Sequence, residues 1–72
     1  MSEQITISKA DAIRVVMNLM ERRNRAQARN EHARDFMAIG FDQSAWTIAE
    51  LLGLDYTELE ALVAAKAAEE SN

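Results

Sequence analysis

The stretch Ala45–Ala64, AWTIAELLGLDYTELEALVA, gives the clearest indication of the fold. Its apolar and small residues recur at intervals of three and four, which is the spacing of one helix face. Gly53 interrupts this pattern, and the apolar residue after it is typical of a helix that ends in the left-handed conformation. Asp55 is then a suitable N-cap for a new helix. The stretch predicts two helices, over 44–52 and 56–69, joined by a tight turn.

Upstream of this pair, the sequence predicts one long helix over 8–39, preceded by an arm over 1–7. Ser8 is a good N-cap, and the chain contains no proline that would break a helix. A helix of some 30 residues would be roughly 45 Å long. The middle of this segment is almost wholly polar, so a break near Asn24 or Asn30 is the alternative. We expect the long helix to end at residue 39, before Gly40.

The residues between these helices supply the expected boundary. Gly40 suits the left-handed position after a helix, and Asp42 or Ser44 can cap the helix that follows. The predicted fold is therefore all-α, with a long N-terminal helix followed by a compact pair of helices in a single domain over 1–72. A chain of this length and composition has no cysteine for a disulfide framework and only one histidine.

Small residues recur in the long helix at seven-residue intervals, with a second row of residues beside them. Such a seam lets two helices approach closely, and polar members in it favour one register. Since a small domain cannot cover so long a helix, we predict a homodimer formed by an antiparallel pair of these helices. The alternative is a helix that lies half exposed across its own domain. The predicted seam contains Val16, Leu19, Arg23, Ala26, Asn30, Ala33 and Met37.

Composition narrows the class of protein. The net charge is -4, and no apolar run approaches the roughly 20 residues of a membrane span. The absence of cysteine fits a reducing compartment, and no signal peptide is visible, so we expect a cytoplasmic protein. No catalytic constellation, phosphate-binding loop or metal-ligand spacing is present, so we expect no enzyme activity, no cofactor and no metal.

The stretch over 45–64 resembles the helix-turn-helix unit. That unit has a small residue where its helices cross, a glycine four residues later and an aliphatic residue six positions after that. Ala49, Gly53 and Leu59 meet this pattern. The resemblance implies a second helix that enters the major groove of DNA with its N-terminal side chains at the base edges. Those side chains include Asp55 and no cation, so phosphates would repel this helix.

Charge is unevenly distributed along the chain. Residues 21–34 carry a net charge of +3, and residues 50–72 carry -5. The basic segment places cations on one helix face at i, i+3, i+7 and i+10, where guanidinium groups can bind carboxylates or phosphates. The alternative is a solvated face with local ion pairs. This basic face contains Arg22, Arg25, Arg29 and His32.

We predict that the basic face contacts a protein partner, together with three residues around the acidic corner of the helix pair. These are Tyr56, Glu60 and Trp46, of which Trp46 has a place in the core as its alternative. The sequence thus predicts a small non-enzymatic protein that binds and modulates another protein, as an inhibitor or anti-activator of the compact kind found in bacteria and phages. The alternatives are a DNA-binding helix-turn-helix transcriptional regulator with an atypical acidic recognition helix, and an antitoxin-like or assembly subunit that folds fully only on its partner.

Overall fold

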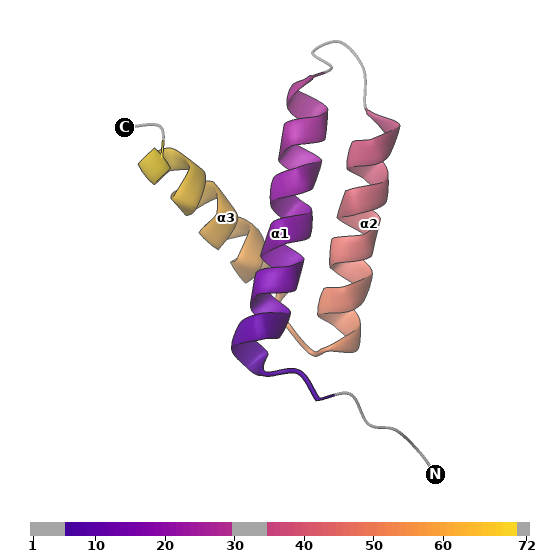
Figure 1. Cartoon of the computed structure of the whole chain (residues 1–72), viewed down its shortest axis with the longest axis vertical. Helices are drawn as coiled ribbons and strands as arrows, with labels where there is room; N and C mark the ends of the chain where they lie inside the picture. The colour runs from indigo at the N-terminus through magenta and orange to yellow at the C-terminus, as the bar shows by residue number, and fades with distance from the viewer. Residues whose placement is uncertain (1–5, 30–34, 71–72) are drawn as a thin grey trace.

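Three helices make up most of the computed structural model, which describes residues 6–29 and 35–70. Helix α1 spans Lys9–Ala28, α2 spans Phe36–Leu51 and α3 spans Tyr56–Glu70. The first two lie side by side and antiparallel, and α3 runs at an angle to that pair (Figure 1). No strand occurs in these two described ranges, so the prediction of an all-α fold is confirmed.

The continuous helix predicted over 8–39 is wrong. Helix α1 ends at its C-cap, Arg29, and α2 begins after the N-cap Asp35, so the chain reverses direction between these two residues. A single helix would leave the small apolar residues of its second half without a covering element. The hairpin instead buries Ala26 of α1 and Ala38 of α2, which removes apolar surface from water.

Asp35 is the local reason why a new helix begins. Its Oδ1 accepts hydrogen bonds from the backbone N–H groups of Met37 (2.9 Å) and Ala38 (3.2 Å), which have no partner within the helix. The N–H of Asp35 also donates to Oε1 of Gln27 near the end of α1 (3.3 Å). The N-cap therefore both starts α2 and connects it to the preceding helix.

The residues predicted to separate two helices lie inside α2. Gly40 was expected to end a helix and Asp42 or Ser44 to cap the next, yet all three belong to one helix that begins at Phe36 rather than at residue 44. The stronger capping signal at Asp35 comes earlier in the chain and makes these later signals redundant. Gly40 consequently occupies a helix interior, where a Cβ would meet no atom within 4 Å.

The turn predicted at Gly53 is confirmed. Gly53 has φ 70°, in the left-handed region, and its N–H donates to the carbonyl of Glu50 (3.2 Å). The N–H of Leu54 donates to the carbonyl of Ala49 (2.8 Å). These two bonds form a Schellman motif, which satisfies carbonyls at the end of α2 and turns the chain toward α3.

The predicted N-caps of the first and third helices are also confirmed. Oγ of Ser8 accepts a hydrogen bond from the N–H of Asp11 (3.1 Å), and Oδ1 of Asp55 accepts one from the N–H of Glu58 (3.1 Å). Each acid in a first turn also faces the positive end of its helix dipole. Local capping therefore fixes where α1 and α3 begin.

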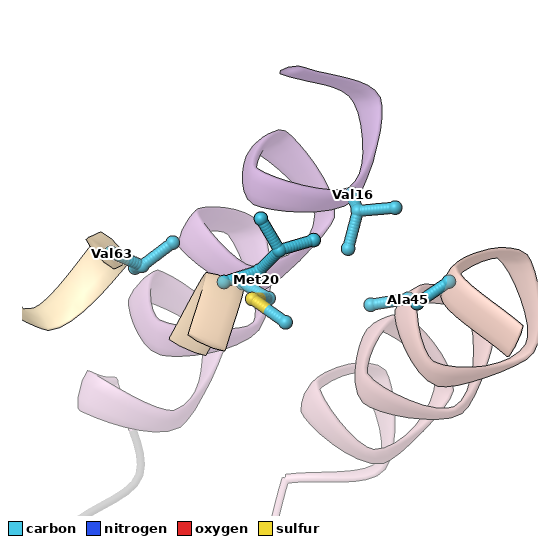
Figure 2. Close-up of a cluster of buried hydrophobic side chains, with 6 residues drawn as sticks. Val16, Met20, Ala45 and Val63 are labelled. Carbon is cyan, nitrogen blue, oxygen red and sulfur yellow. The ribbon is translucent and has the colours of Figure 1, made fainter. Parts of the chain in front are cut away.

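The core lies where all three helices meet (Figure 2). Among the described residues, five of the nine buried apolar residues are alanines, which allow helices to approach closely but bury little area. The buried cluster consists of Val16, Met20, Ala45, Ala49, Leu59 and Val63. Within residues 6–29 and 35–70, more large apolar side chains are exposed than buried, and the exposed ones are Ile7, Val15, Phe36, Met37, Trp46, Leu51, Leu52 and Leu62.

The predicted dimer seam is largely used within one chain. Val16 and Ala26 are buried, and Arg23 makes ion pairs with residues of α2 and α3. Leu19 is half-buried against the core, whereas Met37 is exposed on α2. The remaining seam residues, Asn30 and Ala33, and His32 of the basic face lie outside the described residues. An antiparallel helix pair does form, but α1 and α2 of one chain supply it.

The two glycines should respond to alanine in opposite directions. We expect Gly40→Ala to raise the free energy of unfolding by about 0.5–1 kcal/mol, because it removes a flexible residue from a helix interior with space for a Cβ. We expect Gly53→Ala to lower that free energy by about 1–2 kcal/mol, because alanine is strained in the left-handed region. Chemical denaturation followed by circular dichroism measures both. A loss of stability in Gly40→Ala would contradict the boundaries of α2.

Candidate functional site

Three predicted partner-binding residues line an open groove between α1 and α2. Its volume is about 470 Å³, and its lining combines exposed cations with apolar side chains. Helix α3 contributes nothing to it. We call it the arginine groove, and its lining residues are Arg22, Arg25, Ala28, Arg29, Met37 and Phe41.

Helix geometry explains how these side chains come together. Residues three and four positions apart lie on one side of a helix, which places Arg22, Arg25 and Arg29 in a row at the end of α1. The same spacing places Met37 and Phe41 beside each other on α2. Within residues 6–29 and 35–70, no acidic side chain forms an ion pair with these three arginines. The groove thus offers unpaired cations next to an apolar surface.

The apolar half of this site was not predicted. Met37 was assigned to a dimer seam, and Phe41 was not assigned to a site. Both predictions followed from a first helix that continues to residue 39. Asp35 was the missing signal, because an N-cap there puts Met37 and Phe41 in one helix at i and i+4.

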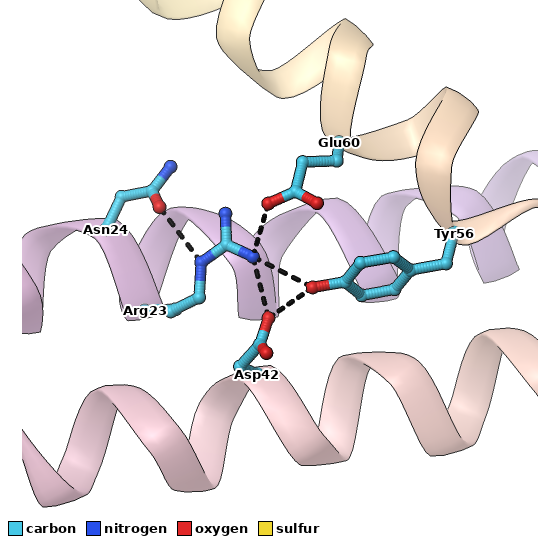
Figure 3. A network of polar contacts seen from close by, with 5 residues as sticks. All are labelled: Arg23, Asn24, Asp42, Tyr56 and Glu60. Atoms are coloured by element: carbon cyan, nitrogen blue, oxygen red, sulfur yellow. Dashed lines mark hydrogen bonds and ion pairs between the residues drawn. The ribbon is translucent and has the colours of Figure 1, made fainter.

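A second polar cluster lies where the three helices meet (Figure 3). Nη1 of Arg23 is 2.7 Å from Oδ1 of Asp42 and 2.8 Å from Oε1 of Glu60, and it donates to the hydroxyl of Tyr56 at 3.0 Å. The Tyr56 hydroxyl donates to the same Asp42 oxygen, and Nε of Arg23 donates to Oδ1 of Asn24 (3.0 Å). One guanidinium therefore connects α1, α2 and α3.

The cluster changes the acidity of its members. Burial and the hydrogen bond to Asp42 raise the pKa of Tyr56 to about 12, and the negative charges of Asp42 and Glu60 act in the same direction. Burial alone would lower the pKa of Arg23. The hydrogen bond to Asp42 and the charge of Glu60 outweigh it, so the pKa of Arg23 is raised. The network therefore holds a protonated phenol and a permanent cation.

The acidic corner predicted as a contact surface is not assembled in that form. Tyr56 and Glu60 point toward Arg23 and take part in the chain's own packing. Trp46 lies on α2 with 52% of its surface exposed, so its alternative place in the core is excluded, and it lines neither the groove nor the cluster. The sequence predicted that Tyr56 and Glu60 would be free to contact a partner, because it assigned Arg23 to the dimer seam.

In the two described ranges, no group of three or more histidine, aspartate or glutamate side chains is placed to hold a metal ion. None of the described helices is both long and apolar enough to span a membrane. We take the arginine groove, where cations lie beside apolar side chains, as the candidate functional site.

Comparison with protein-family models, with curated proteins and with solved structures gave no match to this chain. We therefore infer the function from the arginine groove and its surroundings.

The single tyrosine permits a direct test of the cluster. We expect the folded protein to form tyrosinate with a midpoint near pH 12 and the variant Asp42→Asn to shift that midpoint toward the ordinary value of about 10, because the charged acceptor is lost. The ultraviolet absorbance of tyrosinate measures both. A wild-type midpoint near 10 in a chain that circular dichroism still finds helical would contradict the network.

The same shift predicts how stability depends on pH. Because the pKa of Tyr56 is higher in the folded state than in the unfolded state, its contribution is complete below pH 10 and is lost as pH rises toward 12. We expect the free energy of unfolding to fall across that interval in the wild type and to fall less in Asp42→Asn. Denaturant titrations at several alkaline pH values measure the difference.

Arg23 should matter more for stability than an exposed arginine of the same helix. Arg23→Met leaves Asp42 and Glu60 facing each other without their cation, and we expect it to cost about 1–3 kcal/mol. Arg14→Met is the matched control, since Arg14 is exposed and its ion pair among the described residues is the one with Asp11 (3.4 Å), and we expect a change within about 0.5 kcal/mol. Equal losses in the two variants, measured by chemical denaturation, would contradict the role of Arg23.

Proposed function

We propose that this chain is a small non-enzymatic interaction protein that binds another protein in the arginine groove and thereby modulates it, as an inhibitor or anti-activator. The observation that carries this proposal is the combination of three arginines, which form no ion pair with any described residue, with an exposed apolar lining. Arginine is enriched at interfaces because its planar fork binds carboxylates and its stem packs on apolar groups. The groove therefore suits an acidic protein surface that carries apolar side chains.

An exposed aromatic residue lies on the same helix as the apolar lining of the groove. Phe36, which precedes a lining residue of the groove on α2, is 89% exposed. Large aromatic side chains supply much of the energy at protein interfaces when a partner covers them. A phenylalanine left in water at the start of a helix has a clear use if a partner protein buries it. This supports a protein as the occupant of the groove.

Nucleic acid fits the chain less well. Helix α3 would be the recognition helix of a helix-turn-helix unit, and its first turns hold Glu58 and Glu60 while Asp55 caps it. Nucleic-acid binding draws much of its affinity from cations that neutralise phosphates. The chain as a whole carries -4, and α3 would repel the backbone. A DNA-binding regulator therefore remains the alternative that the experiment below must exclude.

Self-association and location complete the proposal. The small core and the large apolar side chains that stay exposed among the described residues favour a homodimer, which would bury part of that exposed apolar surface. The cysteine-free composition fits a reducing compartment, and we propose the cytoplasm as the place of action.

Affinity capture from the native host, read by quantitative mass spectrometry, tests this function. The groove variant is Arg22→Gln/Arg25→Gln, and the control Lys9→Gln/Arg14→Gln removes the same charge from exposed positions of the same helix. We expect the control to retain a partner captured by the wild type. The groove variant should bind that partner at least about tenfold more weakly, because charge-assisted contacts are lost.

Two outcomes would overturn the proposal. Equal capture by the groove variant and the control would mean that the groove is not the contact surface. Retardation of random duplex DNA by the wild type at about 50 mM salt, lost in the groove variant, would assign the arginines to phosphate binding instead. We expect no such retardation.

A further inference from the structure

Helix α3 carries an exposed stripe that is chemically complementary to the arginine groove. Successive residues of a helix are about 100° apart, so Glu58, Leu62, Ala65 and Glu69 fall within a narrow sector of α3. All four are exposed, and Leu62 leaves 47% of its surface in water. Within the described ranges, neither glutamate of this stripe forms an ion pair. We call these four residues the acidic stripe.

The dimensions of the two surfaces are comparable. At about 1.5 Å per residue, the arginine row from Arg22 to Arg29 extends about 10 Å along α1. The two glutamates of the acidic stripe are about 16 Å apart along α3, with Leu62 between them. Acids can therefore flank the row of arginines while Leu62 contacts the apolar lining formed by Phe41 and its neighbours.

The acidic stripe cannot occupy the groove of its own chain. Helix α3 is held where it lies by three polar links and by the buried core residues Leu59 and Val63. Nζ of Lys66 contacts Oε1 of Glu21 on α1 at 3.3 Å, and Tyr56 and Glu60 join the Arg23 cluster. Among the described residues, those that line the groove come from the α1 and α2 segments and none comes from α3. Its complementary occupant must therefore come from another molecule.

We propose that two copies of this chain associate reciprocally, with the acidic stripe of each copy seated in the arginine groove of the other. One twofold axis satisfies both contacts at once and closes the assembly as a dimer. Each copy then pairs its free arginines with the glutamates of its neighbour and covers Leu62. A direct contact between the two grooves would instead bring six arginines together, which like-charge repulsion disfavours.

This dimer goes beyond the proposed function, because it gives the groove an occupant when no other protein is bound. A partner protein and a second copy would compete for the same arginines. Dissociation of the dimer would then accompany capture of the partner, and the concentration of the chain would set how much of it is free to bind.

A charge exchange between the two surfaces tests the proposal. One variant reverses the groove, Arg22→Glu/Arg25→Glu, and the other reverses the stripe, Glu58→Lys/Glu69→Lys. Each variant alone places like charges against each other at both contacts, so we expect its dissociation constant to rise at least about tenfold. In an equimolar mixture both contacts regain opposite charges. We expect the mixture to form a heterodimer with nearly the wild-type dissociation constant, measured by sedimentation equilibrium and native mass spectrometry.

Two controls keep this test independent of folding. Lys9→Glu/Arg14→Glu matches the groove variant in charge and position on α1, and we expect it to dimerise as the wild type does. For the unmodified chain, we expect the dissociation constant to rise at least about tenfold between roughly 50 and 500 mM salt, because salt screens the paired charges. Circular dichroism verifies that every variant keeps its helices.

Several results would overturn the reciprocal dimer. They are a wild-type monomer at about 100 μM, a dimer whose dissociation constant does not change with salt, and single variants that dimerise as the wild type does. Failure of the two variants to associate when they are mixed would also overturn it. A monomeric wild type that still captures a protein through Arg22 and Arg25 would overturn the dimer and leave the proposed function standing. A dimer that captures no other protein would leave the reciprocal dimer standing and overturn the proposed function.

Discussion

The antiparallel pairing of α1 with α2 creates both the core and the arginine groove. Ala26 and Ala38 are buried, and the arginine row of one helix lies beside Met37 and Phe41 of the other. Without the reversal between Arg29 and Asp35, there would be no groove. Small residues make the pairing possible because they let the helix backbones approach closely, and the small core that results leaves large apolar side chains exposed.

Arg23 explains how the third helix is fixed to this pair. Its guanidinium contacts Asp42 and Glu60 within 3 Å, while its own side chain is only 15% exposed. A partly buried cation of this kind stabilises the fold when acids surround it and destabilises it when they are removed. Because Asp42 accepts hydrogen bonds from both Arg23 and Tyr56, one carboxylate binds side chains of two helices. These contacts hold α3 at an angle that leaves its acidic stripe in water.

Local signals in the sequence were sufficient for the helix class, for the turn at Gly53 and for the caps Ser8 and Asp55. They failed between Arg29 and Gly40, because no proline marks the break there and the signal that does, the N-cap Asp35, follows a polar segment that is also compatible with a continuous helix. The arginine half of the groove follows from spacing along one helix. Its apolar half and the Arg23 cluster do not, since both join residues that are distant in sequence and meet only after the chain has doubled back.

A distance between spin labels on α1 and α2 measures whether the two helices form a hairpin within one chain. Asn18 and Thr47 are exposed on α1 and α2, near the level at which the core residues of the two helices meet. Helix axes in contact are about 8–10 Å apart, and each label lies about 10 Å out on the far face of its helix, so labels at these positions, in chains diluted with unlabelled protein, should give a mean separation below about 30 Å. A continuous first helix would place Asn18 about 30 Å from Ile39 alone. A mean separation beyond about 30 Å would contradict the hairpin and, with it, the groove.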